Sequence, residues 1–183
     1  ALAAAAAVAA ADDRVERVVI ATPDKDLAQC VQGERVVQYD RRAQQFRGHD
    51  EVLEKYGVAP ESIPDWLALV GDSADGFPGL SGWGAKSAAA VLRVYGHLDE
   101  IPHSPGQWDV PGVRGAAKLA ATLSSDYENA LLFRTLARLV TDVEVGAVDD
   151  WKWTGPTEDL EQWCDRLDAP DVLTKARRLA SKS

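Results

Sequence analysis

The stretch that decides the fold is GDSADGFPGLSGWGAKSAAAVL, which runs from Gly71 to Leu92. Two acids, Asp72 and Asp75, directly precede a glycine-punctuated turn. The turn opens into an alanine-rich helix with Lys86 near its start. Carboxylates bind hard divalent cations, and the exposed N–H groups of a helix N-terminus attract phosphate. A metal site beside a phosphate site is typical of an enzyme that acts on a phosphodiester backbone.

A second pair of acids lies upstream, in TPDKD, directly after the β-branched run Val18–Ala21. We read that run as a buried parallel strand, and active sites of α/β sheets usually lie where such strands end. Asp24 and Asp26 are two residues apart, so in an extended segment they face the same way and can converge on one cation. A D-x-D pair alone is usually a solvated turn, and the hypothesis of a metal site depends on the combination.

Together the four acids Asp24, Asp26, Asp72 and Asp75 predict a site for Mg²⁺ or Mn²⁺, because packed carboxylates repel one another unless a cation neutralises them. Asp72 and Asp75 have the three-residue spacing of neighbours on a helical turn. Two such ions about 3.5–4 Å apart can activate a water and stabilise both oxygens of an in-line displacement at phosphorus.

The glycines of the turn, Gly79, Gly82 and Gly84, allow the backbone to approach a partner closely. Lys86 and Ser87 at the helix start can add donors to a phosphate oxygen. The alternative is a packed helix–turn–helix corner without a ligand. Three glycines and a lysine are more than a corner needs, which favours a phosphate site.

The segment VPGVRGAAKLAATL, Val110–Leu123, repeats this pattern of Pro-Gly, a second glycine and a helix with a lysine. It is either an echo of one phosphate-binding device or simply a second helix-entry turn. Arg114 and Lys118 on it either touch a phosphate backbone or form a solvated helix face.

The remaining elements are mostly helical. The alanine-rich stretch 1–11 is predicted to be a buried helix, because alanine is the best helix former. Glu34–Asp40 is a second strand, paired with the region Gln44–Arg47. Further helices are expected at 50–57, 64–70, 86–95, 128–140, 158–167 and 170–181.

Composition sets weaker limits. With 183 residues and a net charge of −9, the chain does not look like a nonspecific polyanion binder, yet metal-binding acids contribute to that charge and a nuclease is not excluded. Cys30 and Cys164 fit no metal spacing and are expected to be free thiols. No apolar run is long enough to span a membrane. We expect Trp151, Trp153 and Trp163 to pack rather than stack on bases.

TPDKD followed by the glycine-rich string closely resembles the bacterial and phage 5′-nuclease family, which includes flap endonucleases and the 5′–3′ exonuclease domain of DNA polymerase I. The likeness extends to about Val145. It implies an α/β fold: the C-terminal part of a Rossmann-like (PIN-like) nuclease core with a helix–three-turn–helix that grips duplex DNA. The implied divisions are a partial core at 1–48, the DNA-binding region at 49–145 and a helical extension at 146–183.

The resemblance also implies ligands. The four acids match the second metal site, with Asp24 bridging both metals. A K⁺ ion at the helix–three-turn–helix would be held by the backbone carbonyls of Leu69, Val70, Pro78, Leu80 and Trp83. The DNA contacts expected from the residues and the resemblance together are Gly79, Ser81, Gly82, Gly84, Lys86, Ser87, Arg114 and Lys118.

The chain departs from the family pattern at its start. Family members begin with an aspartate-bearing strand, further acids and a basic helical arch, and here the sequence starts at the helix that follows them. Asp12 and Asp13 lie after that helix and are not assigned to the missing motif. We therefore expect a C-terminal portion that lacks several ligands of the first metal and is inactive alone.

The function implied for the intact protein is a structure-specific 5′ nuclease that hydrolyses DNA at 5′ flaps, nicks, gaps or 5′ ends. It is expected to be a cytoplasmic, nucleoid-associated monomer without membrane contact. Two alternatives stay open. One is a DNA-binding protein that has lost catalysis, although a pure binder gains nothing from four mutually repelling acids. The other is a metal nuclease with a related core, such as a toxin-type ribonuclease, which would lack the glycine-rich turn.

Overall fold

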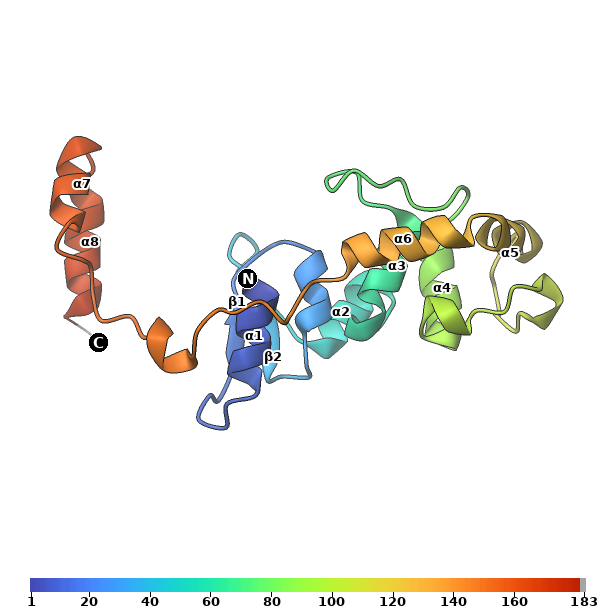
Figure 1. The fold of residues 1–183 in the computed structure, drawn as a ribbon, viewed down its shortest axis with the longest axis horizontal. Coiled ribbons are helices and arrows are strands. Elements are labelled where there is room, and N and C mark those ends of the chain that lie inside the picture. The colour runs from blue at the N-terminus through green and yellow to red at the C-terminus, as the bar shows by residue number, and fades with distance from the viewer. Residues whose placement is uncertain (182–183) are drawn as a thin grey trace. The chain divides into compact units, whose positions relative to one another are not determined.

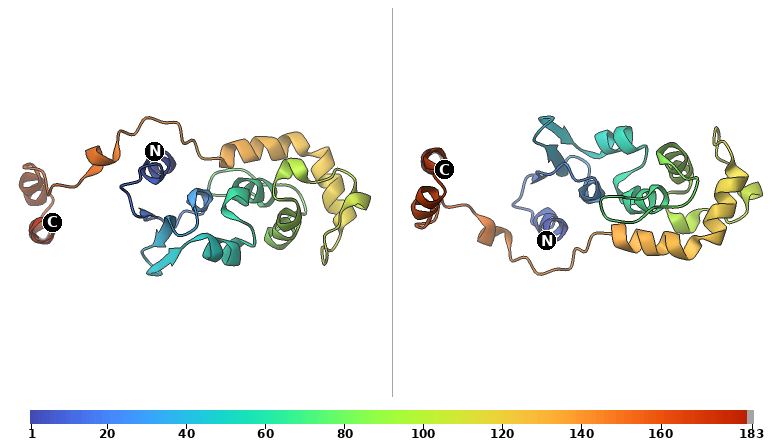
Figure 2. Two further views of the ribbon diagram at one scale, coloured as in Figure 1. Left: turned by 90° about the horizontal axis from the view of Figure 1, so that it is seen from below. Right: turned by 90° about the horizontal axis from the view of Figure 1, so that it is seen from above.

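The computed structural model describes residues 1–181, and it divides into two compact units, Ala1–Val145 and Gly146 to the end of the chain. Figures 1 and 2 show the elements of each unit from three directions. The larger unit carries every residue predicted to belong to the functional site.

The first part of the larger unit contains a small mixed sheet. Strands β1 (Val18–Ile20) and β2 (Val36–Asp40) are parallel, and β3 (Gln45–Arg47) pairs antiparallel with β2, which gives the order β1-β2-β3. Helix α1 (Leu2–Ala10) lies against β1, as Figure 1 shows. Because alanine side chains are short, the helix can bury its inner face close to the strands. These elements confirm the α/β class predicted from the sequence.

Two polar side chains tie distant segments to this sheet. Arg35, just before β2, donates from its guanidinium to the carbonyls of Ala10, Asp12 and Val15, at 2.6–3.2 Å, and so holds the end of α1. Gln29 uses both ends of its amide: Nε2 donates to the carbonyls of Asp26 and Ala137, and Oε1 accepts from the N–H of Leu139. Gln29 thereby joins the loop after β1 to the chain that follows the last helix of this unit.

Helices make up the rest of the larger unit. Their bounds are α2 His49–Tyr56, α3 Ile63–Val70, α4 Ala85–Tyr95, α5 Ala116–Ser125 and α6 Tyr127–Ala137. Short 3-10 helices lie at η1 Asp26–Cys30, η2 Pro60–Ser62, η3 Leu98–Glu100 and η4 Pro105–Gln107. Helix α3 is the centre of the core. It is buried almost throughout and packs against α4 and α6 (Figure 1).

A buried ionic cluster fixes α3 against α6. Asp65 is 1% exposed, and its carboxylate accepts from Arg134 Nη1 at 3.3 Å and from the N–H of Leu98 at 3.2 Å. His97 Nδ1 lies 2.9 Å from the same carboxylate, and Arg134 also pairs with Asp99 at 2.6 Å. A buried carboxylate of this kind is tolerable only because its oxygens are paired.

The smaller unit is a short helical segment with η5 (Val148–Trp151), α7 (Leu160–Arg166) and α8 (Pro170–Ala180). Cys164 is its one buried hydrophobic residue among those described. The expected packing of the tryptophans is not core packing: Trp151, Trp153 and Trp163 are 38%, 49% and 50% exposed, and the Trp163 ring packs at the surface under Arg166. Two short helices provide too little interior for three indoles. Within residues 1–181, no helix has the length and apolar character needed to cross a bilayer.

Candidate metal centre and nucleic-acid surface

The loop that follows β1 places the first two acids. The carbonyl of Asp24 accepts a 2.6 Å hydrogen bond from Nε2 of Gln38, which is 1% exposed on β2. Asp24 Oδ1 accepts from the N–H of Asp26 at 3.1 Å, and η1 begins at Asp26. The chain therefore turns into a helix between the two acids, so they do not lie in the extended segment that the sequence predicted.

A tight loop after α3 places the other two acids. Asp72 and Phe77 exchange backbone hydrogen bonds of 2.8 and 3.1 Å, which closes the loop. Asp72 Oδ1 accepts from the N–H of Ala74 at 3.0 Å, and the Asp72 side chain is 4% exposed. Asp75, near the tip of the loop, is exposed.

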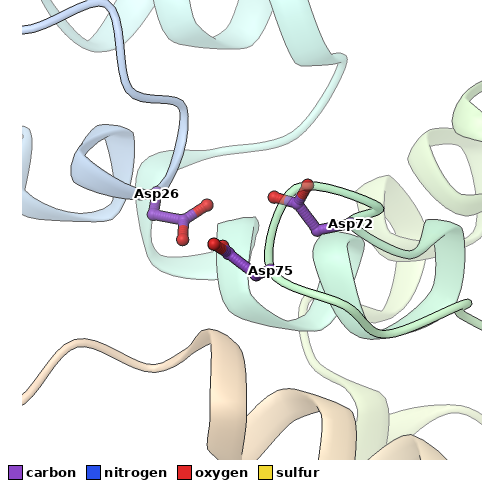
Figure 3. Close-up of side chains that lie close together, drawn as sticks. All are labelled: Asp26, Asp72 and Asp75. Carbon is purple, nitrogen blue, oxygen red and sulfur yellow. The ribbon is translucent and has the colours of Figure 1, made fainter.

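The two loops bring three carboxylates together. One oxygen of each of Asp26, Asp72 and Asp75 lies within 4.8 Å of the others, and the side chains converge from the two loops in Figure 3. Asp24 is not in this group, but it lines a hollow of about 520 Å³ together with Asp72 and Asp75. The structure thus groups three of the four predicted metal ligands, and the fourth, Asp24, shares the hollow with two of them.

The pKa values of two acids in the cluster, Asp26 and Asp72, are shifted in opposite directions. The pKa of Asp26 is raised to about 7, chiefly by burial and also by the hydrogen bond with Asp75 and the charges of Asp24, Asp75 and Asp72. Burial also acts to raise the pKa of Asp72, but the hydrogen bonds from Lys25 and from the backbone of Ala74 lower it on balance. Lys25 Nζ lies 2.5 Å from Asp72 Oδ2.

The residues present fit a hard divalent cation. Among the described residues, Asp26 Oδ1 is a buried side-chain oxygen without a hydrogen-bond partner, although such atoms in proteins normally have one. An unpaired carboxylate oxygen beside two further carboxylates is the donor set that Mg²⁺ or Mn²⁺ prefers.

The second part of the candidate site is formed by the two glycine-rich turns. Gly82, Gly84, Lys86 and Ser87 line a hollow of about 630 Å³ together with Arg114. The two turns that the sequence suggested as equivalents therefore lie side by side. One positive side chain from each turn, Lys86 and Arg114, borders the space between them.

Trp83 holds these turns in place. It is 7% exposed, its indole N–H donates to the carbonyl of Leu119 at 3.3 Å, and its ring lies 5.9 Å from that of Trp108. Ser87 closes the start of α4, because its hydroxyl exchanges 3.0 Å hydrogen bonds with the N–H and carbonyl of Gly84. The Ser87 hydroxyl thus bonds within its own turn, and Lys86 is the charged side chain at the start of the helix.

The other predicted contacts lie outside this hollow. Ser81 and Lys118 are exposed and do not line it. Gly79 is instead in close backbone contact with the end of α3. Of the carbonyls predicted to bind K⁺, that of Leu69 accepts from the N–H of Leu80 at 2.9 Å, and that of Leu80 accepts from Trp83 at 3.1 Å. Val70 and Pro78 border a separate hollow with Asp72.

Sequence reasoning missed two residues of the acidic hollow, the one lined by Asp24, Asp72 and Asp75: these are Lys25 and Lys55. It also missed Gln38, which holds the carbonyl of Asp24. A polar residue inside the apolar strand VVQY was the available signal for Gln38, and a lysine between two acids was the signal for Lys25. Nothing in the sequence around Lys55 predicts its position, because only the fold brings the end of α2 beside the two acidic loops.

Replacing Gln38 with leucine tests its role in holding the loop after β1. The Asp24 carbonyl loses its donor, so we expect the free energy of unfolding to fall by about 1–3 kcal/mol. Gln32→Leu is the matched control, because Gln32 is exposed and such a change usually alters stability by less than about 0.5 kcal/mol. Urea denaturation measures both, and equal stabilities would contradict the assignment.

Comparison with known proteins is consistent with this geometry. The family described as "5'-3' exonuclease, C-terminal SAM fold" matches residues 58–159. DNA polymerase I of Pseudomonas aeruginosa is 38% identical over 146 residues, which is 75% of this chain and 15% of that protein. A 5'-3' exonuclease of Aquifex aeolicus is 42% identical over 85 residues, or 46% of this chain and 29% of that protein. The chain thus spans less than a third of these relatives.

Solved structures show the same fold. A bacteriophage T5 flap endonuclease in a pseudo-enzyme-product complex with DNA and metal ions has a TM-score of 0.59 at 20% identity. That likeness covers 74% of this chain and 48% of the other. T5 5'-exonuclease with bound zinc has a TM-score of 0.56 at 19% identity, covering 74% and 49%. With the family match over more than half of its length, the chain belongs to the 5'-3' exonuclease family, whose C-terminal SAM fold it contains.

Proposed function

We propose that this chain is part of a divalent-metal-dependent, structure-specific 5′ nuclease that hydrolyses phosphodiesters of DNA by 5′–3′ exonuclease and flap endonuclease action. The observation that supports the proposal most directly is the convergence of Asp26, Asp72 and Asp75 around a buried, unpartnered carboxylate oxygen. Acids gathered in this way repel one another, and a bound cation gives them a function.

The two parts of the site have different proposed roles: the acids bind metal, and the glycine-rich turns bind the duplex. Asp26, Asp72 and Asp75, with Asp24 at the edge, hold Mg²⁺ or Mn²⁺, and an intact site holds two such ions. A bound divalent ion supplies an activated water and stabilises charge on the phosphoryl oxygens. The residues of this chain fix where that ion sits.

The glycine-rich turns hold the duplex by its backbone. Lys86 and Arg114 border one hollow, so they can contact phosphates that follow each other along a strand. Ser81 and Lys118 extend this exposed surface, and Gly79, Gly82, Gly84 and Ser87 shape it. A K⁺ ion on the carbonyls of Leu69, Val70, Pro78, Leu80 and Trp83 would add a cation that bridges to the strand.

The proposed substrate is DNA with a 5′ flap, nick, gap or free 5′ end, read by shape rather than by base edges. The intact protein is proposed to act as a monomer on nucleoid DNA in the cytoplasm. Two of the relatives are named for DNA polymerase I and 5'-3' exonuclease, and one structural neighbour is a complex with DNA, which supports this choice.

A cleavage assay tests the proposal. The full-length protein is incubated with a 5′-labelled flap duplex in Mg²⁺ or Mn²⁺, beside a matched RNA flap and an EDTA control. Metal-dependent release of the DNA flap is the expected result. Binding without cleavage would favour the DNA-binding protein that has lost catalysis, and preference for RNA would favour a ribonuclease.

Replacing Lys86 with alanine tests the duplex contact. We expect weaker binding to duplex DNA and a salt dependence of log K that is less steep by about 1, the change expected for one lost phosphate contact. Lys175→Ala removes an equally exposed lysine from α8 and serves as the control. Fluorescence anisotropy at several salt concentrations measures both, and an unchanged slope for Lys86→Ala would exclude a phosphate contact.

A further inference from the structure

The acidic loop after β1 carries its own cation. Lys25 lies between Asp24 and Asp26 in the chain, and its Nζ is 2.5 Å from Oδ2 of Asp72 in the other loop. It also lines the acidic hollow with Asp24, Asp72 and Asp75. This ion pair therefore connects the two loops that must come together to form the metal centre.

The two oxygens of Asp72 have different partners. Oδ1 accepts from the N–H of Ala74 at 3.0 Å, which fixes the carboxylate within its own loop, whereas Oδ2 contacts Lys25. A cation that uses the second oxygen takes the position of the ammonium. A divalent ion and a lysine ammonium are both positive, so they cannot share one carboxylate oxygen at contact distance without strong repulsion.

The exposures of the two partners show which one can leave. The Asp72 side chain is 4% exposed and anchored, whereas the Lys25 side chain is 36% exposed. Lys25 can therefore swing its ammonium into water, whereas Asp72 stays in place.

We infer that Lys25 is a built-in counter-cation of the metal centre: its ammonium neutralises Asp72 while the metal is absent and is displaced when the metal binds. This inference rests on the proposed metal-dependent function. It gives Lys25 a positioning role, in which it holds the two acidic loops together in the metal-free protein and competes with the metal for Asp72.

Removal of the Lys25 charge should strengthen metal binding but destabilise the metal-free protein. Lys25→Met should bind Mn²⁺ about tenfold more tightly, because an ion pair worth about 1.4 kcal/mol corresponds to a factor of ten. The metal-free variant should unfold at a lower temperature, because a buried carboxylate has lost its partner. Lys25→Arg keeps the charge and should stay close to the wild type in both measurements.

Lys55→Met is the matched control, because Lys55 borders the same hollow but stacks on the Tyr56 ring, 4.9 Å from its centroid, instead of contacting Asp72. Electron paramagnetic resonance of free Mn²⁺ in the full chain measures the affinities. An affinity for Lys25→Met that equals that of the wild type or Lys55→Met would overturn the inference.

Asp72→Asn separates this failure from failure of the proposed function. If Asp72→Asn weakens Mn²⁺ binding but Lys25→Met leaves it unchanged, the metal centre stands and only the counter-cation role is lost. If the wild type binds no Mn²⁺, or if Asp72→Asn binds it as well as the wild type, both are overturned.

A measurement on the wild type keeps the inference testable if Lys25→Met does not fold. Acetylation of lysines, read by mass spectrometry, reports how free each ammonium is. Mg²⁺ should increase the labelling rate of Lys25 relative to Lys55, because the metal releases the ammonium from Asp72. A ratio that Mg²⁺ does not change would contradict the displacement.

Discussion

Asparagine at both Asp72 and Asp75 is expected to abolish metal-dependent cleavage by the full-length protein while duplex binding persists. The double variant removes two of the three clustered carboxylates. A bound metal contributes several kcal/mol to stabilisation of the transition state, so the rate should fall by about 10³-fold or more. Lys86 and Arg114 lie in another hollow, so the surface proposed to bind DNA remains intact.

Flap cleavage measures the first effect, and anisotropy with labelled duplex in Ca²⁺ measures the second. Asp171→Asn provides the control, because Asp171 is exposed on α8 and belongs to neither hollow. Circular dichroism checks that the double variant is folded. Cleavage at the wild-type rate would refute the metal assignment, and an unfolded variant would show that the two acids serve the fold instead.

Alanine at Gly79 is expected to destabilise the fold more than any other single change considered. Gly79 has a φ of +71°, and a Cβ there would lie 2.5 Å from the carbonyl carbon of Val70, 2.7 Å from the oxygen of Leu69 and closer still to the nitrogen of Gly71. All three atoms belong to the backbone and cannot rotate away. We therefore expect a loss of about 4 kcal/mol in the free energy of unfolding.

Gly82→Ala isolates the steric part of this effect. Gly82 has a similar φ of +81°, but a Cβ there would meet no atom within 4 Å. Strain in the left-handed region alone costs about 1–2 kcal/mol. Urea denaturation of both variants gives the difference, and equal losses would mean that the approach of the two backbone segments is not tight.

Much of the fold follows from local sequence signals. The run VVI forms a parallel strand, the alanine-rich start forms a helix against it, and α2 and α4 end directly before Gly57 and Gly96 as the glycines indicate. The prediction that this strand is buried holds only for Ile20, because successive side chains of a strand point to opposite faces and Val19 is 46% exposed. Each of these elements depends on neighbours in the chain, which the sequence displays directly.

The structure differs from the prediction where contacts between residues far apart in the chain determine the local conformation. Asp24 and Asp26 do not converge as an extended pair, because Gln38 on the next strand holds the Asp24 carbonyl and η1 begins at Asp26. The partners Asp65 and Arg134 are 69 residues apart, so no local pattern predicts that pair. Spacing along the chain located the acids of the candidate site, and contacts between distant segments determined how they are arranged.

The amide of Gln29 has a consequence for the order in which the protein assembles. It joins the carbonyl of Asp26 to the carbonyl of Ala137 and the N–H of Leu139, across 108 and 110 residues. A ribosome adds about 5–20 residues per second, so this link forms only after several seconds of further synthesis. The nascent chain therefore carries the acidic loop in an incompletely tethered form until α6 emerges. Completion of the acidic centre is thus a late event in folding, coupled to the arrival of the last helix of the larger unit.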